Sequence, residues 1–528
     1  MASESDPELD PTMFRPPIAR GMQILDRSFF QKTVRLKAAR VFDNKNISRI
    51  RSQLERSKDA LQQDRLANVY PDPDPDQAKV GRKCILLRPE VRQDPLPPAM
   101  LNESTNGETP HYQTNDDSDH KAISWPHSST LTEPATQNLI SVIPYNLNLD
   151  YTYWPYHSII ASILPESLHS EIPSGFSQVG HVVHLNLRET YLPYKHLIAQ
   201  ILIDKNPGAR TVINKIDDVG EENEFRTFKY ECLAGEDDLN VVVSEAGCEF
   251  RFDYGKVYWN PRLSTEHGRL VALFQAGEAV CDVMAGIGPF AVPAGRKGVF
   301  VWGNDLNPES YSGLTDAIAR NKAGDFVTAF NQDGRTFIKD TVRQLLEDEK
   351  KVEIKKKVSR KDPAGTKPEV IQLVEQPKTF QHYVLNLPAS ALTFLSSFIG
   401  LYPPELREKI PERTPMPLVH VYCFSTKDEL EAGSSSSIPS GNINEPADPI
   451  GDDNIDDQAR VHTDAQEDNA IAKICAMISR QLQHEMRPGK MGDKDAVEVW
   501  DVRDVAPKKR MFCASFRLPE EVAFRVSG

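Results

Sequence analysis

An aspartate, two glycines and a second aspartate stand at a spacing that suits the binding of a nucleotide. Asp282 lies near the end of an apolar run at 278–283, and Gly286 and Gly288 follow it before a helical pattern. Glycines let the backbone approach a ligand closely, and the start of a helix offers unpaired N–H groups. Asp305 ends the next apolar run, about 20 residues further on, where a carboxylate accepts both hydroxyls of a ribose. The pattern predicts a parallel sheet that holds a nucleoside-containing cofactor at its carboxyl edge.

The identity of that nucleoside has to be decided between two cofactors. The glycine pattern also satisfies the loose dinucleotide fingerprint, so NAD is an alternative to S-adenosylmethionine. Asp282 is an awkward neighbour for a pyrophosphate but suits a cationic methionine group. Asp333 ends a third apolar run, where a carboxylate can accept from an adenine amino group, and Asn386 ends a fourth. Acids or amides after four successive strands are typical of a class I methyltransferase, with a sheet that binds no ligand as the remaining alternative.

Composition limits the possible classes of protein. The chain has 528 residues, enough for two or three domains, and a net charge of −14. Its seven cysteines form no CxxC pair or Cys/His cluster, which predicts reduced thiols, no metal and a protein that is not secreted. No apolar run approaches the roughly 18 residues of a membrane span. The negative charge argues only weakly against nucleic acid, because a local basic patch is what meets phosphates.

Four polar segments divide the chain. Residues 1–13 are expected to be disordered, and residues 92–137, rich in Pro, Asn, Ser and Thr, to be a linker or a disordered insert. Charged inserts at 348–368 and 430–462 are expected to lengthen surface loops at a small entropic cost. Between these segments we predict a small α/β module at 14–91, an α+β domain at 138–260 and a larger α/β domain with a parallel sheet at 261–528.

A polar segment just before the glycine-rich strand carries groups suited to proton transfer. Residues 258–267 include Arg262 and Glu266, one helical turn apart and expected on one face. After Asn386 the sequence has Ala389 where enzymes that methylate exocyclic amines commonly have an aromatic ring, which favours a ring N–H as methyl acceptor. Such an acceptor needs a general base and a cation. On spacing alone, the segment can equally be a capped helix start with a solvated arginine.

A set of motifs in this order resembles the tRNA (guanine-N1)-methyltransferases of archaea and eukaryotes, which modify guanosine 37 beside the anticodon. The resemblance runs from about 180 to 425, resumes at 500–509 and is fainter over 14–91. It implies a Rossmann-like class I methyltransferase domain preceded by RNA-recognition domains, S-adenosylmethionine as cofactor and tRNA with guanosine at position 37 as substrate. The motifs are residues 225–226, 257–266, 282–290, 304–310, 333–338 and 386–389.

The resemblance also implies roles for residues that act on the base. Glu266 matches the proposed general base that removes the guanine N1 proton, and Arg226 matches an arginine thought to stabilise charge at guanine O6. Asn386 matches an amide that orients the base. Tyr258 and Arg262 match residues that shape the site and contact RNA.

Cofactor contacts are implied along the strand ends. Asp305 and Leu306 match positions at the ribose, Asp333 and Gly334 match positions at the adenine, and His267 matches a position that lines the pocket. The predicted cofactor site is completed by Asp282, Gly286, Gly288 and Asn386.

Two rival functions stay open. A related enzyme of the wybutosine pathway transfers the aminocarboxypropyl group of the same cofactor to tRNA, and a catalytically silent relative would only bind RNA. The intact segment at 258–266 favours methylation over aminocarboxypropyl transfer, and the full set of strand-end acids disfavours a relative that only binds RNA.

In this family the first module recognises the outer corner of tRNA, which gives the basic segment 14–40 a function; an ordinary helix with a solvated face is the alternative. The lysine-rich insert 348–368 is expected to be solvated.

The family occurs in the cytoplasm, the nucleus and the mitochondrial matrix. The acidic first residues make a poor transit peptide, whereas a start at Met13 would expose an arginine-rich, acid-poor stretch. We therefore expect a cytoplasmic and nuclear protein with a possible mitochondrial matrix pool, acting as a monomer without contacting a membrane.

Overall fold

The computed structural model describes residues 12–89, 92–95, 121–124, 139–216, 225, 227, 229–356, 369–426, 455–506 and 509–526. Side chains are described for all of these except 92–95, 121–124, 426, 455–468 and 506. Residues 1–11 of the predicted disordered segment 1–13 and most of the predicted inserts at 92–137 and 430–462 therefore lie outside the described residues. Within the first insert, β4 (Arg92–Pro95) and β5 (Lys121–Ser124) form an antiparallel pair.

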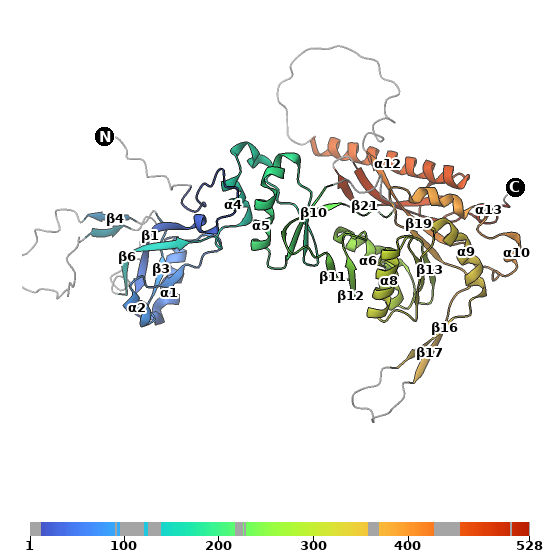
Figure 1. Cartoon of the computed structure of the whole chain (residues 1–528), viewed down its shortest axis with the longest axis horizontal. Coiled ribbons are helices and arrows are strands. Elements are labelled where there is room, and N and C mark those ends of the chain that lie inside the picture. The colour runs from blue at the N-terminus through green and yellow to red at the C-terminus, as the bar shows by residue number, and fades with distance from the viewer. Residues whose placement is uncertain are drawn as a thin grey trace, which may run out of the picture. The chain divides into compact units, whose positions relative to one another are not determined.

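The chain packs into two compact units, which Figure 1 colours from blue to red along the sequence. The first unit is Met1–Gly175 with Leu187–Pro207, and the second is Phe176–Asn186 with Gly208–Gly528.

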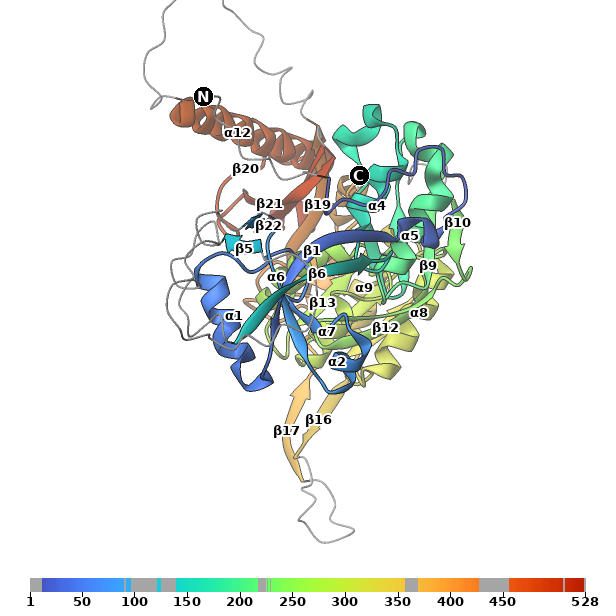
Figure 2. The same ribbon diagram turned by 90° about the vertical axis from the view of Figure 1, so that its left-hand side faces the viewer.

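The first unit is built on an antiparallel sheet in the strand order β2 (Val69–Pro71), β3 (Lys83–Leu86), β1 (Lys32–Val41) and β6 (Ile140–Leu149). β1 pairs with β6 along its whole length (Figure 2). Helix α1 (Ile47–Arg56) buries Ile50 and Leu54 in the core of this sheet. Because β6 lies in the region predicted as the middle domain, 138–260, the N-terminal module draws a strand from beyond the insert at 92–137.

The basic segment 14–40, all of which the structure describes, contains no α-helix. It forms a 3-10 turn, η1 (Arg27–Phe30), and most of β1, so the alternative of an ordinary helix is wrong. The remaining helices of the unit include α4 (Tyr156–Ile163) and α5 (Lys195–Lys205). Asp204 on α5 accepts hydrogen bonds from Arg27 Nε at 2.8 Å and Tyr151 OH at 2.9 Å. These hydrogen bonds, one on the surface and one partly buried, connect η1 to α5.

A mixed eight-stranded sheet forms the centre of the second unit, in the order β15 (Val327–Phe330), β14 (Phe300–Asn304), β13 (Ala279–Asp282), β18 (His382–Leu385), β19 (Leu418–Thr426), β22 (Lys509–Arg517), β21 (Ala496–Ala506) and β20 (Arg487–Pro488). The first five strands are parallel, and β22 runs antiparallel to both of its neighbours. The predicted parallel sheet is therefore confirmed, and it continues into an antiparallel edge.

The strand order reverses between β13 and β18. From β13 the chain moves outward to β14 and β15, and then returns to β18 and β19 on the other side. In open α/β sheets the ligand crevice lies at such a switch point, outside the carboxyl ends of the strands. The sheet therefore directs a ligand to the ends of β13 and β18.

Helices cover both faces of this sheet, as Figure 1 shows. Alternate residues of a strand face opposite sides, and Cys281 and Val280 of β13 accordingly belong to two different hydrophobic clusters. The helices that pack on the side of Cys281 include α9 (Gly334–Glu347) and α12 (Ile455–Leu482). Those that pack with Val280 are α6 (Ser264–Leu273), α7 (Ala291–Arg296) and α8 (Pro308–Arg320).

The layer that precedes α6 shares a core with this sheet. Its strands are β10 (Tyr230–Gly235), β9 (Thr211–Lys215), β8 (Val182–Leu185) and β7 (Ser177–Val179) in one sheet, with β11 (Asn240–Glu245) and β12 (Cys248–Asp253) as a hairpin. Ile213 and Phe250 belong to the same hydrophobic cluster as Val280. Much of the region predicted as a separate domain at 138–260 thus packs directly on the sheet of 261–528, and the predicted limits remain predictions.

The predicted charged insert at 348–368 begins as a strand. β16 (Lys351–Lys355) pairs antiparallel with β17 (Val370–Glu375), and the hairpin extends away from the sheet in Figure 1. Val352 anchors it in the core beside α9. Residues 357–368 lie outside the described residues.

All seven cysteines are free, and all but Cys232 are buried. None of the helices in the described ranges combines the length and the apolarity needed to cross a bilayer.

Candidate functional site

A cavity lies at the switch point, at the carboxyl ends of the parallel strands. The segments after β13, β14, β15 and β18 all contribute to its wall, together with the segment before α6. The structure thus brings together most of the predicted site residues. Those that line the cavity are Tyr258, His267, Gly286, Asp305, Leu306, Asp333, Gly334 and Asn386.

Four predicted residues stand outside the lining. Arg262, Glu266, Asp282 and Gly288 are not among the residues of the cavity wall. Arg226 lies outside the described residues, although its neighbour Phe225 lines the cavity.

The two glycines after β13 have different structural tasks. Both adopt positive φ angles, 57° at Gly286 and 92° at Gly288, which disfavour other residues. A Cβ on Gly286 would meet nothing within 4 Å, so this glycine faces open space in the cavity. A Cβ on Gly288 would lie 2.6 Å from Cδ1 of Leu314 on α8. Gly288 therefore permits close packing of α8 and is not part of the cavity wall.

Asp305 holds the glycine turn in place. Its Oδ2 accepts from the Gly286 N–H at 2.8 Å, and its Oδ1 accepts from the Asn307 N–H at 3.0 Å. Burial raises the pKa of Asp305, and these backbone hydrogen bonds oppose the rise. Each carboxylate oxygen has two lone pairs, so the oxygens keep the capacity to accept from the two hydroxyls of a ribose.

Asn304 is a residue of this site that the sequence analysis did not assign. Its side chain is 1% exposed, and its Nδ2 donates to the carbonyls of Val283 and Gln332, each at 3.0 Å. Its Oδ1 accepts from the Gln332 N–H at 2.9 Å. One amide thus joins the ends of β13, β14 and β15. The available signal was its position directly before Asp305, at the end of a buried strand.

Asp282 ends β13, directly before the cavity-lining segment that starts at Val283. The side chain is fully buried, and neither carboxylate oxygen has a hydrogen-bond partner in the described part of the chain. Burial, followed by the charge of Asp305, raises the pKa of Asp282 well above its ordinary value. Without a nearby cation, this environment favours the neutral acid.

Glu266 is held on the side of α6 that faces the sheet. Its carboxylate forms two hydrogen bonds with Arg269, at 2.6 Å to Nε and 2.7 Å to Nη2, and accepts from Tyr422 OH at 2.7 Å. The side chain is buried at 5% exposure, whereas Arg262 is exposed. The expected shared face of Arg262 and Glu266 is therefore wrong, because Arg262 belongs to the 3-10 turn η6 (Pro261–Leu263) and α6 starts only at Ser264.

The helix-cap interpretation of this segment is confirmed in one respect. Asn260 Oδ1 accepts from the Arg262 N–H at 3.1 Å, with Pro261 in the first turn. The cap fixes the backbone that carries both Tyr258 and Glu266, so the two interpretations do not exclude each other.

His267 and Asp333 join the cavity wall to neighbouring elements. His267 Nδ1 lies 2.6 Å from the Glu245 carboxylate of β11, and its ring packs edge-on against Phe290 at 4.8 Å. Asp333 Oδ1 caps α9 by accepting from the N–H groups of Arg335 and Thr336. Both side chains are therefore oriented before any ligand binds.

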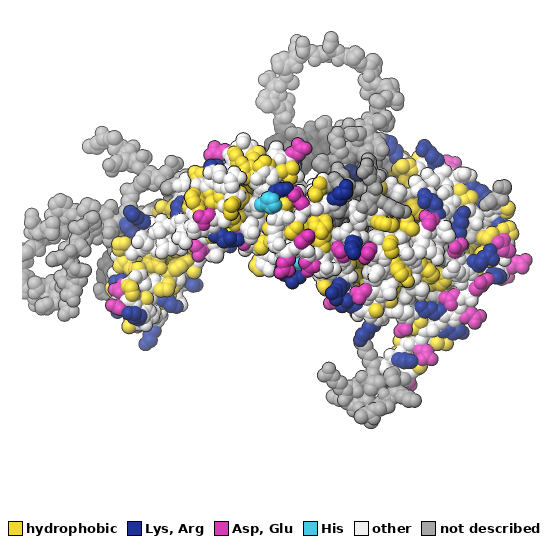
Figure 3. Space-filling view, in the orientation of Figure 1, with side chains coloured by type: hydrophobic (Ala, Val, Ile, Leu, Met, Phe, Trp, Pro, Cys, Tyr) yellow, Lys and Arg dark blue, Asp and Glu magenta, His cyan; other side chains and the backbone are white. Residues whose placement is uncertain are grey.

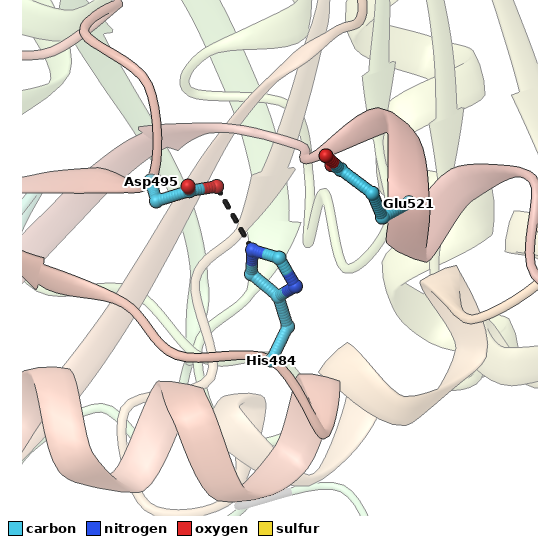
Figure 4. Close-up of side chains that lie close together, drawn as sticks. All are labelled: His484, Asp495 and Glu521. Carbon is cyan, nitrogen blue, oxygen red and sulfur yellow. Dashed lines mark hydrogen bonds and ion pairs between the residues drawn. The ribbon is translucent and has the colours of Figure 1, made fainter.

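A separate group of potential metal ligands lies away from the cavity (Figure 4). His484 Nε2 is 2.9 Å from Asp495 Oδ1, and Glu521 forms an ion pair with Lys494 at 3.2 Å. The contacts connect the end of α12, the segment before β21 and the short helix α13 (Glu520–Ala523). Because Asp495 contacts His484 and Glu521 pairs with Lys494, we interpret this group as one that stabilises the packing of these segments.

Comparisons with known proteins match the chain at both the family and the full-length level. The model for the TRM5/TYW2 methyltransferase domain matches residues 241–349, and the model for the TYW2 N-terminal domain matches residues 156–238. A tRNA (guanine(37)-N(1))-methyltransferase of Fusarium vanettenii is 46% identical, covering 98% of this chain and 97% of its own length. One of the same name from Emericella nidulans is 45% identical, covering 98% and 96%. The crystal structure of Trm5b from Pyrococcus abyssi is 17% identical, covers 92% of this chain and 99% of its own, and has a TM-score of 0.48.

The Asn304 amide generates a prediction about stability. Asn304→Asp keeps the shape of the side chain but replaces two donated hydrogen bonds with a charge facing two carbonyls. We expect the free energy of unfolding to fall by about 2–4 kcal/mol at neutral pH, measured by urea denaturation. The same change at the exposed Asn240 serves as control and should alter stability by less than about 1 kcal/mol. Equal effects of the two variants would contradict the cross-linking role.

Proposed function

Since the chain belongs to the tRNA (guanine(37)-N(1))-methyltransferases of the TRM5/TYW2 family, we propose that it methylates N1 of guanosine 37 in tRNA with S-adenosylmethionine. The observation that carries this proposal is the likeness to relatives of that name, 46% identical over 98% of the chain. The TRM5/TYW2 model is shared with the wybutosine branch, and the full-length relatives favour methylation. The large sheet is proposed to be a Rossmann-like class I methyltransferase domain, because its strand order reverses where the cavity lies.

The residues around the cavity fit S-adenosylmethionine, which supplies an electrophilic methyl group on a sulfonium when bound. The turn at Gly286 leaves space for a ligand. Asp305 is proposed to accept from the ribose hydroxyls and Asp333 to accept from the adenine amino group, with Leu306 and Gly334 beside them. His267 and Asn386 form the remaining wall.

Asp282 is proposed to support the cofactor from below the turn. Its two unpartnered oxygens lie in a site that favours the neutral acid, and a nearby positive charge would favour the ionised form instead. Gly288 contributes indirectly, because it lets α8 pack against the turn.

Glu266 is proposed to take the proton from guanine N1. Arg269 holds the Glu266 carboxylate through two hydrogen bonds. The same pairing holds the carboxylate outside the cavity wall, so proton transfer requires the Glu266 side chain to exchange partners when the base enters. Arg226 is proposed to stabilise the charge that develops at O6, and Asn386 to orient the base.

The first unit is proposed to contact the outer corner of tRNA through its basic segment 14–40. In the second unit, Tyr258 and Arg262 are proposed to contact RNA at the cavity. The proposed state is a monomer, and the proposed compartments are the cytoplasm and nucleus with a mitochondrial matrix pool.

A methylation assay tests the function directly. The purified chain, supplied with S-adenosylmethionine, should methylate a tRNA transcript with guanosine at position 37 and leave one with adenosine there unmodified. Nucleoside analysis should identify the product as 1-methylguanosine. Transfer of an aminocarboxypropyl group, or methylation independent of the base at position 37, would refute the proposal.

Asp305→Ala tests the ribose contact. The variant loses the charged acceptor of two hydroxyls, and hydrogen bonds to charged groups contribute roughly 1.5–3 kcal/mol. We therefore expect the dissociation constant of S-adenosylmethionine to rise about 10- to 100-fold in calorimetry. Asp316→Ala, on the exposed face of α8, is the control. Unchanged affinity in a folded Asp305→Ala protein would place the ribose elsewhere.

Glu266→Gln tests the general base. The glutamine can still accept from Tyr422 but cannot take a proton, so single-turnover methyl transfer should fall roughly 10²- to 10⁴-fold. Binding of tRNA and cofactor should change little.

Arg269→Gln separates this role from a structural one. If Glu266 serves only as the partner of Arg269, both variants should slow methyl transfer alike. If Glu266 is the general base, Arg269→Gln should slow methyl transfer much less than Glu266→Gln does. Equal losses of rate in the two variants, or a near-normal rate in Glu266→Gln, would reject Glu266 as the base.

A further inference from the structure

Two arginines of the second unit have no carboxylate partner in the described part of the chain. Arg262 lies in η6, and Arg503 comes from β21, far along the chain. Throughout the described ranges, neither guanidinium forms an ion pair with an acid. Arg503 Nε donates to the Asp504 carbonyl at 3.0 Å, but its Nη1 is buried and finds no acceptor among the described residues. A buried, unpaired guanidinium nitrogen is unfavourable, which indicates a missing anion.

A β-bulge determines where Arg503 points. Asp501 lies opposite Phe512, but Arg503 lies opposite Met511, so β21 carries one extra residue, Val502, at this place. Directly opposed residues of an antiparallel pair share a face of the sheet. The extra residue therefore moves Arg503 away from the face of Phe512 and onto that of Met511. Met511 belongs to the cluster that packs with α6, so the bulge turns Arg503 toward the helix that carries the site.

The electrostatic environment joins Arg503 to the cavity rim. Burial and then the positive charge of Arg262 lower the pKa of Arg503, whereas Tyr258 and Asp504 oppose this change. Tyr258 lines the cavity. Arg262 and Tyr258 therefore lie within electrostatic reach of Arg503.

The acids around this edge are already engaged. Asp501 and Asp504 both pair with Arg510, and Glu266 pairs with Arg269. On the face of the second unit that Figure 3 shows, Lys and Arg are mixed with Asp and Glu, without a broad basic surface. Attraction of an anion therefore depends on the local pair of arginines.

Exposed aromatic rings accompany the two cations. Tyr258 is 44% exposed and Trp500 is 52% exposed, with Arg269 5.1 Å from the Trp500 ring centroid. Trp500 lies opposite Cys513 and so shares the sheet face that Met511 and Arg503 occupy. Rings beside cations are typical of sites for unpaired nucleotides, whose bases stack while their phosphates pair. A nucleic-acid phosphate fits this edge better than a small free anion.

We propose that Arg503, together with Arg262, binds a backbone phosphate next to the nucleotide whose base enters the cavity. This site rests on the proposed function, because it takes tRNA as the ligand. Arg503 is a positioning residue. It holds the RNA backbone in place while the base reaches the residues at the ends of β13 and β18.

Salt-dependent binding of a guanosine-37 tRNA transcript tests the proposal. Arg503→Ala should weaken binding by about 10-fold or more and reduce the slope of log affinity against log salt by about 1, as for one lost phosphate contact. Arg503→Lys should retain the slope. Affinity for S-adenosylmethionine should not change in either variant. Arg343→Ala, an exposed arginine of α9 outside the cavity wall, controls for the loss of one charge.

Neutral methylphosphonate linkages locate the phosphate without any change in the protein. Placed in turn on either side of nucleotide 37, one linkage should weaken binding to the wild type and have little further effect on Arg503→Ala. Equal losses in both proteins at every linkage, or an unchanged affinity and slope in Arg503→Ala, would overturn the proposal. A loss of cofactor affinity in its place would assign Arg503 to the methionine carboxylate.

These outcomes are separable from a failure of the proposed function. If the wild type binds the transcript with the expected dependence on Arg503 but transfers no methyl group, the phosphate site stands and the reaction fails. If it methylates guanosine 37 and Arg503→Ala binds normally, the reaction stands and the phosphate site fails. A wild type that does not bind the transcript refutes both.

Discussion

The carboxyl edge of the sheet depends on one buried amide. Strand ends leave the hydrogen-bonding ladder, so their backbone groups need other partners if they are buried. Asn304 supplies three of these partners at once, to Val283 and to both backbone groups of Gln332. The adjacent Asp305 then fixes the Gly286 turn. The wall of the cavity is therefore formed by side chain to backbone contacts between loops, and it does not require a ligand for its shape.

The positions of residues that directly follow a strand could be predicted from the sequence, because the strand, its turn and the acid at its end are neighbours in the chain. The parallel sheet and the cavity positions of Gly286, Asp305 and Asp333 are of this kind. Glu266 shows the limit of this approach: its Arg269 partner is one turn away, but Tyr422 comes from a strand 156 residues further on. A sequence pattern describes which groups are present, whereas the packing of α6 on the sheet determines which way they face.

Two other features depend on register, which the sequence alone did not reveal. The bulge at Val502 changes the face of Arg503, and a second irregularity between Asp504 and Ala506 shifts the register again. The sheet of the first unit likewise takes β6 from beyond a long insert, although the module was predicted to lie within 14–91. In both cases the decisive partner is a distant strand, and hydrophobic alternation fits more than one pairing.

The division into two units limits how parts of such a chain can be exchanged between genes by recombination. The backbone passes from one unit to the other at residues 175/176, 186/187 and 207/208. A gene fragment that begins at residue 208 would lack β7 and β8, and β9 would become an unprotected edge strand. The cavity is lined only by residues of the second unit, yet that unit cannot be transferred as one uninterrupted stretch of sequence. A single break at 175/176 would keep every strand with its sheet but would separate α5 from the rest of the first unit. Exchange of the whole first unit therefore has to preserve all three crossings.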